Sequence, residues 1–254
     1  MCGRYVMARA SGDLMAEADA LLGEQLEGRE LSPSWNVAPT TDVPIVLERL
    51  VGDEPRREVH VAQWGLVPRW AKDVKVGVRA FNARSETVTE KPTFRSAVVS
   101  RRCAVPMDGY YEWKRQGTGR TSPKQPYFVH AADGGLSFFA GLYEWWKDPA
   151  VADGEPGQWI LSTSIVTMPS PDPGAEGVLG DLGGLHDRLP VPLSGEAMDA
   201  WLDPAERDAA SLVERIRAEA YDVAASWRLD PVGAAVGNVR NNGPELIAPV
   251  SALF

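Results

Sequence analysis

Cys2 is the residue of the sequence with the most distinctive possible reactivity. Initiator methionine is commonly removed before a small residue, and its removal would leave Cys2 with an α-amine and a thiol on one residue. An α-amine has a pKa of about 7.7 to 8.0 and a free thiol one of about 8.5, so a fraction of each is nucleophilic near neutral pH. With an aldehyde, the amine forms an imine and the thiol closes on the same carbon to give a thiazolidine, helped by proximity. The alternative is a small apolar residue packed in a first strand.

A dense group of polar side chains occurs at Asn82, Arg84, Ser85 and Glu86. The forked guanidinium of Arg84 could bind a phosphate, and the amide of Asn82 could orient a small nucleophile. Ser85 is also a suitable N-cap, so a capped helix start is the alternative interpretation of this segment.

Glu112 lies among Tyr110, Tyr111 and Trp113, directly after an apolar run. Desolvation among aromatic rings raises the pKa of a carboxyl group, which makes Glu112 a candidate general acid and base. Trp113 offers a face on which an unpaired base could stack. The alternative is that the three aromatic residues alternate within the core.

His186 follows a glycine-rich stretch and begins the sequence His186-Asp187-Arg188. A loop histidine beside an acid and a base is suited to proton transfer, and the alternative is an exposed loop histidine without a role. His60 and His130 lie in strand-like runs and are expected to finish sheet edges. The sequence contains no HExxH, no CxxC and no glycine-rich phosphate loop, so it predicts neither a metal nor a nucleotide cofactor.

The composition is that of a globular chain: 254 residues, 44% hydrophobic and 24% charged. Two cysteines are too few for a disulfide framework, and Cys103 lies in an apolar run typical of a core. The sequence shows no run of 18 apolar residues and no secretory signal. We therefore expect a soluble, cytoplasmic protein without a membrane partner, nucleoid-associated if it is bacterial.

The charge is unevenly distributed along the chain. The net charge is −9, yet residues 68–125 carry 13 Lys and Arg against 5 Asp and Glu, or +8, and the remainder carries −17. Charges act over about 8 to 10 Å at physiological salt, so this asymmetry favours a confined surface that binds an anion. A solvated face is the alternative.

The pattern of apolar residues predicts one α+β domain, residues 1–254, with a β-rich core. A helix is expected over 11–28 with Ser11 as its cap, a second near Ser194 and a third at Asp203-Pro204. Surface loops are expected at 115–126, 148–157 and 169–184. The expected strands are residues 43–47, 59–64, 102–107, 127–130, 136–146 and 159–167.

Together, several motifs resemble those of the SRAP family, the SOS-response-associated peptidase proteins. They occur in the family's order and span residues 2 to about 250: Met1-Cys2-Gly3-Arg4-Tyr5, Trp35-Asn36-Val37-Ala38-Pro39, Trp64-Gly65-Leu66-Val67-Pro68, Asn82-Ala83-Arg84-Ser85-Glu86, Asp108-Gly109-Tyr110-Tyr111-Glu112-Trp113, His186-Asp187-Arg188 and Val236-Gly237-Asn238-Val239.

This resemblance implies a barrel-like sheet core with peripheral helices, and a protein that covalently traps abasic sites in single-stranded DNA without a metal or cofactor. Cys2 corresponds to the family's N-terminal cysteine. Asn82 would position its amine, Glu112 would assist opening of the abasic sugar, and His186 would assist imine chemistry and crosslink reversal. An abasic sugar in its open form is an aldehyde, so the resemblance agrees with the chemistry expected of Cys2.

The resemblance also assigns DNA contacts. The family's phosphate and sugar contacts, and the residues that shape the path of the bases, correspond to Arg4, Pro39, Arg84, Trp113, Thr167 and Arg188. One departure is visible, because Thr167 and His186 are 19 positions apart, a longer connection than is usual in the family. The acidic remainder of the chain predicts weak, strongly salt-dependent binding to intact DNA.

Two further enzyme classes and one binding class remain open on the sequence. Cys2 could serve an N-terminal-nucleophile amidohydrolase with its own amine as the base, or a thiol peptidase with His186. Alternatively, the basic segment and the tryptophans could bind single-stranded DNA without any bond formation.

Overall fold

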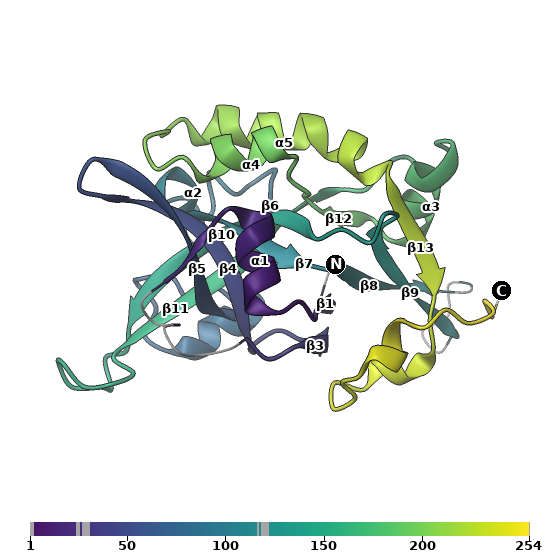
Figure 1. Ribbon diagram of the computed structural model, residues 1–254, viewed down its shortest axis with the longest axis horizontal. Coiled ribbons are helices and arrows are strands. Elements are labelled where there is room, and N and C mark those ends of the chain that lie inside the picture. Colours follow the sequence, from purple (N-terminus) through teal and green to yellow (C-terminus); the bar gives the residue numbers. More distant parts are fainter. Residues whose placement is uncertain (1–2, 24–25, 27–30, 116, 118–121, 254) are drawn as a thin grey trace.

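The computed structural model describes residues 3–23, 26, 31–115, 117 and 122–253, and shows an α+β fold built on two sheets (Figure 1). Two helices, α4 (Gly195–Leu202) and α5 (Ala209–Ala224), run along one side of the molecule, outside the sheets. The expected β-rich α+β class is confirmed.

The larger sheet curves into a ring. Its strands follow the order β12–β11–β10–β7–β4–β5–β2, and β5 also pairs in parallel with β11, with Gln63 opposite Ser162 and Trp64 opposite Thr163. This extra pairing closes the ring and confirms the barrel-like core. The strands are β2 (Leu21–Leu22), β4 (Asp42–Val51), β5 (Glu54–Trp64), β7 (Arg102–Met107), β10 (Ser137–Lys147), β11 (Trp159–Pro169) and β12 (Arg188–Pro190), while β6 (Asn82–Arg84) pairs with β11 alone.

The smaller sheet carries the start of the described chain. Its order is β13–β9–β8–β1–β3, and Tyr5 in β1 lies opposite both Val37 in β3 and Tyr110 in β8. Its strands are β1 (Tyr5–Met7), β3 (Ser34–Val37), β8 (Gly109–Arg115), β9 (Lys124–Ala131) and β13 (Trp227–Pro231). Because β1 is a central strand, Arg4, the residue directly before it, also lies beside β8.

The strands inside the ring are covered on both faces. Residues 43–47 of β4 and all of β7 are buried, which explains their continuous apolar sequence. Cys103 lies in β7 and is fully buried, as predicted, and burial raises the pKa of its thiol to about 12.

Trp64, at the end of β5, joins the two sheets. Its indole N–H donates to the carbonyl of Phe81 at 2.9 Å, and its ring centroid lies 5.1 Å from that of Tyr5 and 5.9 Å from that of Phe81. Beyond Trp64, Gly65 has a φ of 132°, and a Cβ there would lie 2.6 Å from the carbonyl oxygen of Gly77. The fully buried indole therefore holds β1 and the start of β6 in one place.

The remaining helices are short. They are α1 (Ser11–Ala18), α2 (Ala97–Ser100), α3 (Gly177–Leu185) and the 3-10 helices η2 (Val74–Arg79), η3 (Ala234–Gly237) and η4 (Pro244–Ile247). Ser194 caps α4 as predicted, because its hydroxyl accepts from the N–H of Ala197. Within the described part of the chain, no helix has both the length and the apolar character needed to cross a membrane.

Two predicted helix boundaries are wrong. The helix expected over 11–28 ends at Ala18, because Asp19 takes a left-handed conformation with a φ of 48° and its N–H returns to the helix carbonyls. Residues 21–22 form β2 instead, while 24–25 and 27–28 lie outside the described residues. Ser11 is not the cap, since Ala10 holds that position. The helix expected at Asp203-Pro204 begins at Ala209, since Asp203 ends α4 and its carboxylate accepts from the N–H of Ala205 in a turn.

The predicted strands all lie at their expected places, but β4 and β5 extend to Val51 and Glu54 in an exposed hairpin, where charged residues interrupt the apolar pattern. The segment 109–115 was not predicted as a strand and forms β8. Among the predicted loops, 148–157 is confirmed between β10 and β11, whereas 169–184 contains most of α3 and 115–126 includes the start of β9. Residues 116 and 118–121 of that last loop lie outside the described residues.

Arg102 is a buried cation that binds backbone carbonyls. Its side chain is largely enclosed, and burial lowers its pKa. The guanidinium donates to carbonyls at the ends of α2 and α4 and in the turn that follows, namely those of Val98, Val99, Trp201, Asp203 and Glu206. These carbonyls have no helical partner of their own, so Arg102 satisfies two helix ends at once.

We expect Arg102→Lys to lower the free energy of unfolding by about 3 kcal/mol, because one ammonium group cannot reach all of these carbonyls and leaves buried acceptors unpaired. Urea denaturation measures the change. Arg228→Lys is the control, since its side chain is 59% exposed. Equal midpoints for the two variants would contradict this role.

Candidate active site

The predicted catalytic residues come from three elements. Asn82 opens β6 and lies opposite Ile165 in β11, Glu112 lies in the middle of β8, and His186 is the C-cap of α3. Cys2, the predicted nucleophile, lies outside the described residues. Arg4, near the beginning of the described residues, is held against β8. Its carbonyl accepts from the N–H of Tyr111, the residue before Glu112, at 2.8 Å.

Glu112 and His186 form a pair. The carboxylate oxygen Oε1 of Glu112 lies 3.9 Å from Nε2 of His186. Glu112 is 6% exposed, so its carboxyl group is largely removed from water, while the histidine side chain remains 28% exposed. A buried carboxyl group facing a partly accessible imidazole can exchange protons with a bound substrate.

The hydrogen bonds of His186 bear on its protonation. Its Nδ1 accepts from the backbone N–H of Arg188 at 2.9 Å, and the same atom lies 2.8 Å from Oδ1 of Asp187. The first contact requires an unprotonated Nδ1, which places the proton of the neutral ring on Nε2, facing Glu112.

Helix α3 explains the long connection between Thr167 and His186. Thr167 pairs with Pro190 across the β11–β12 hairpin, and α3 lies within that connection. A Cβ at Gly183 would lie 2.8 Å from the backbone nitrogen of Pro173, so only glycine lets α3 rest on the preceding segment. The apparent loop therefore contains a packed helix that ends at His186.

Arg188 is held by an acid. Its Nη1 and Nη2 donate to the two carboxylate oxygens of Glu86, the Nη2 contact being 2.9 Å, and Nη2 also donates to the carbonyl of Thr167 at 2.7 Å. The hydrogen bond from Arg188 lowers the pKa of Glu86 to about 2. Thr167 is fully buried and its hydroxyl donates to the carbonyl of Ala83 at 3.4 Å. The DNA contacts assigned to Thr167 and Arg188 thus start from side chains that already have protein partners.

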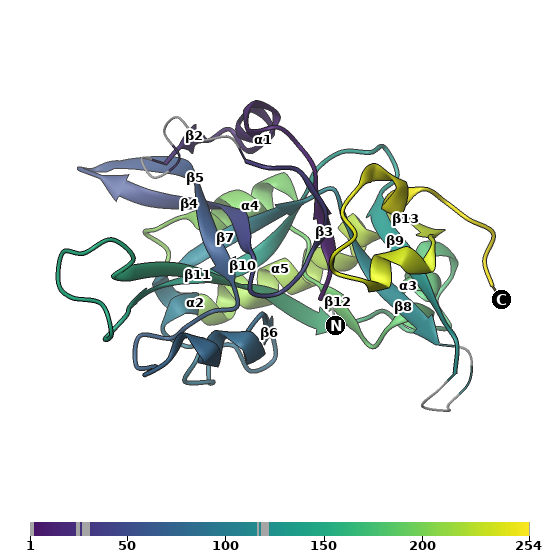
Figure 2. The same ribbon diagram turned by 90° about the horizontal axis from the view of Figure 1, so that it is seen from below.

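Arg4 lies between two of the sequence motifs. Its Nη1 donates to Oδ1 of Asn36 at 2.8 Å and to the carbonyl of Val236 at 2.9 Å, and its guanidinium carbon lies 6.0 Å from the ring centroid of Trp113. Burial lowers the pKa of this half-buried arginine. Asn36 in turn donates to the carbonyl of Asn241, which fastens the C-terminal segment beside β3 (Figure 2).

The other predicted DNA contacts are accessible. Arg84 ends β6 and is exposed, and Pro39 lies half-buried in the turn after β3. Trp113 is half-buried in β8. The sequence motifs predicted no role in this site for Glu86 or Asn36, although both lie inside the motifs that carry the family resemblance. The nearness of Glu86 to Arg84 could have indicated that Glu86 belongs to the site. For Asn36, the available signal was the group of asparagines in the C-terminal segment.

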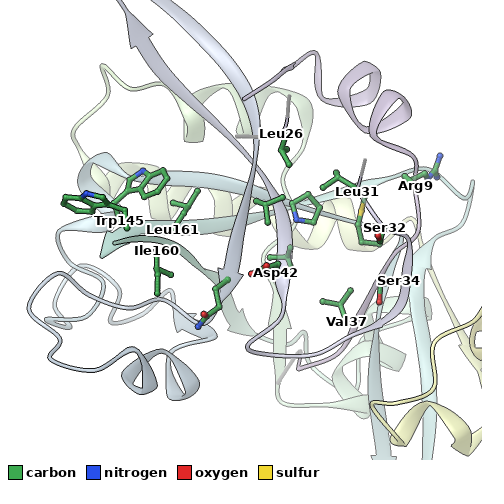
Figure 3. A pocket seen from close by; sticks show the side chains of 16 residues that line it. Arg9, Leu26, Leu31, Ser32, Ser34, Val37, Asp42, Trp145, Ile160 and Leu161 are labelled. Carbon is green, nitrogen blue, oxygen red and sulfur yellow. The ribbon is translucent and has the colours of Figure 1, made fainter. Parts of the chain in front are cut away.

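Two further observations concern the surroundings. In the part of the chain that the structure describes, no group of three or more His, Cys, Asp and Glu residues could hold a metal ion. A cavity of about 600 Å³ is lined by Arg9, Asp42, Trp145, Leu161 and neighbouring side chains, and by none of the described residues predicted for the site (Figure 3). The candidate site is therefore defined by its side-chain contacts and not by this cavity.

We expect Glu86→Gln to lower the free energy of unfolding at neutral pH. Because the folded-state pKa of about 2 lies below the ordinary value of 4.5, the stabilisation is complete above about pH 4.5 and is lost as the pH falls toward 2. The unscreened difference corresponds to about 3 kcal/mol, which solvent at this 35% exposed side chain reduces to about 1 kcal/mol. Urea denaturation at several pH values measures it, with Glu90→Gln as the control. A difference from wild type that stays constant down to pH 2 would contradict the assignment.

Comparison with known proteins adds to this geometry. Residues 1–239 match the family model described as SOS response associated peptidase (SRAP). The chain is 35% identical over 247 residues to the abasic site processing protein YoqW of Bacillus subtilis, covering 97% of this chain and 99% of that one. It is 30% identical over 297 residues to the abasic site processing protein HMCES of Rattus norvegicus, covering 100% of this chain and 77% of that one.

A solved structure shares the fold. An X-ray structure of a protein from Bacteroides thetaiotaomicron superposes with a TM-score of 0.72 at 23% identity, covering 98% of this chain and all of that one. The family model and the curated relatives each extend over most of the chain. The chain belongs to the SRAP family.

Proposed function

We propose that the protein processes abasic sites in single-stranded DNA by capturing them covalently through Cys2, with Met1 removed, as a thiazolidine. Its relatives are named abasic site processing proteins. The observation that carries the proposal is the pair formed by Glu112 in β8 and His186 at the end of α3, with the backbone of Arg4 bonded to the residue before Glu112. Arg4, two residues after Cys2 in the sequence, is thereby held beside the strand that carries Glu112.

The reaction balances without a cofactor. The Cys2 amine adds to the C1′ aldehyde of the opened abasic sugar, and loss of one water gives an imine. The Cys2 sulfur then adds to the imine carbon, and the nitrogen takes up a proton to complete the ring. Capture therefore consumes no reductant or oxidant and releases one water molecule.

The described side chains suit the proton transfers of these steps. The Glu112 carboxyl group can protonate the ring oxygen as the sugar opens, and His186 can donate from Nε2 to the leaving hydroxyl of the first adduct. Asn82 has an amide that can hold the Cys2 amine through a hydrogen bond. The same groups acting in reverse would reopen the ring and release the DNA.

DNA binding in the proposal depends on the arginines and on Trp113. The exposed guanidinium of Arg84 is available to a phosphate, and Arg4 lies against the Trp113 ring beside the turn that contains Pro39. Arg188 and Thr167 would contact the lesion's backbone after some of their present hydrogen bonds are exchanged. The net charge of −9 makes binding to intact DNA weak, so covalent capture supplies the selectivity.

We expect the protein without Met1 to form a heat-stable adduct with single-stranded DNA that carries an abasic site, and Cys2→Ala to form none. Cys103→Ala is the matched control, because the Cys103 thiol is fully buried with its pKa raised to about 12. Denaturing electrophoresis and intact-mass measurement detect the adduct, whose mass is that of protein plus DNA less one water.

Two outcomes would overturn the proposal: no adduct with wild type, or an undiminished adduct with Cys2→Ala. Reversible binding that is indifferent to Cys2 would instead identify a non-covalent DNA-binding module. Glutaminase or peptidase activity abolished by Cys2→Ser would identify a thiol hydrolase.

We expect Arg84→Ala to weaken binding to intact single-stranded DNA and to reduce the slope of log affinity against log salt by about 0.7, the value for one phosphate contact on a single strand. Fluorescence anisotropy across a salt series measures both quantities. Arg215→Ala, on the exposed face of α5, is the control. An unchanged slope would remove Arg84 from the phosphate contacts.

A further inference from the structure

Arg188 joins two parts of the candidate site through different atoms. Its guanidinium is 9% exposed and forms two hydrogen bonds with Glu86, while its backbone N–H donates to Nδ1 of His186 at 2.9 Å. The orientation of the His186 ring therefore depends on where the backbone of residue 188 lies. The side chain of the same residue is the anchor that holds this backbone.

Glu86 is itself fixed from the opposite side. The hydroxyl of Ser85 donates to Oε2 of Glu86 at 3.0 Å, and the N–H of Ser85 donates to the carbonyl of Thr167 at 2.8 Å. That carbonyl also accepts from Nη2 of Arg188. The turn after β6, the C-terminal part of β11 and the start of β12 are thus tied together by Glu86 and one backbone carbonyl.

We propose that Glu86 is a positioning residue, which through its ion pair with Arg188 holds the His186 ring with Nδ1 accepting and the Nε2 proton facing Glu112. The effect of Glu86 on DNA capture rests on the proposed function. Its effect on the His186 ring does not, because the contacts that hold the ring are present in the DNA-free protein.

The consequence of losing the carboxylate follows from its contacts. A glutamine at position 86 keeps one acceptor oxygen, so Arg188 retains one bond there and its bond to Thr167, but loses the two-oxygen match of a carboxylate. The β12 backbone is then held less firmly, and the backbone N–H of Arg188 no longer keeps a fixed hydrogen bond to Nδ1 of His186. Removal of a negative charge near the predicted phosphate contacts does not weaken attraction for DNA.

Glu86→Gln is therefore expected to separate chemistry from binding. At saturating abasic DNA, the single-turnover rate of adduct formation should fall about tenfold, while the Kd for intact single-stranded DNA stays equal or decreases. Glu90→Gln, in the same segment and exposed, should leave both quantities at the wild-type values. A variant that was merely unstable would lose rate and affinity together.

A spectroscopic measurement tests the ring directly. In DNA-free protein, at a pH alkaline enough to keep the imidazole neutral, the ¹⁵N chemical shifts of the two ring nitrogens of His186 report which one carries the proton. We expect a single Nε2–H tautomer in wild type and in Glu90→Gln, and a mixture of both tautomers in Glu86→Gln.

The outcomes are separable. An unchanged tautomer in Glu86→Gln overturns the positioning role, whatever its adduct rate. A mixed tautomer with a wild-type adduct rate also overturns it, because the ring orientation would then not matter to capture. Absence of any adduct with wild type would reject the proposed function alone, since the tautomer measurement stands without DNA.

Discussion

The two edges of β11 set the arrangement of the whole protein. One edge pairs with β10 along seven residue pairs, from Gly141–Ile165 to Lys147–Trp159. Beyond β10 on that same edge, β12 pairs with residues 167–169, while the other edge is shared by β5 and then β6. Because a strand has only two edges, the partners on each edge must follow one another along β11: β10 at 159–165 and then β12, and on the opposite edge β5 at 162–163 and then β6 at 165–167. The β5 pairing closes the ring, and the C-terminal part of β11 carries Asn82, opposite Ile165, on one edge and Arg188, opposite Pro169, on the other.

The candidate site is built where the end of α3, just before β12, meets the smaller sheet. Glu112 comes from β8 of the smaller sheet, and His186 comes from the helix that precedes β12 in the ring. Their side chains approach to 3.9 Å at the junction of the two sheets, so small movements of β12 change this distance directly. The buried Trp64 indole stabilises the same junction from the other side, through Tyr5 and Phe81. The geometry of the candidate site is thus a property of how the two sheets meet.

Local patterns in the sequence were sufficient for the longer strands of the ring and for the residue types of the site, but not for short strands such as β1 and β6, for β8, or for the partners of the site residues. The apolar runs within β4 and β7 predicted strands because burial on both faces leaves a continuous signal. The end of α1 at Asp19 could not be predicted, because the left-handed cap depends on one backbone angle and no glycine marks it. Likewise, Glu86 is separated from Arg188 by 102 positions, and nothing in either segment indicates that they pair. Such contacts depend on sheet closure, which is a tertiary effect.

The contact between Arg4 and the carbonyl of Val236 spans 232 positions, almost the full chain. During synthesis on the ribosome, the amino terminus emerges first and the segment that fastens it emerges last. Contacts so distant in sequence require closure of a very large loop, which is slow compared with local structure formation. For most of translation, a nascent chain therefore lacks the contact between Arg4 and the C-terminal segment. Any reactivity that depends on this contact is confined to the finished, folded polypeptide.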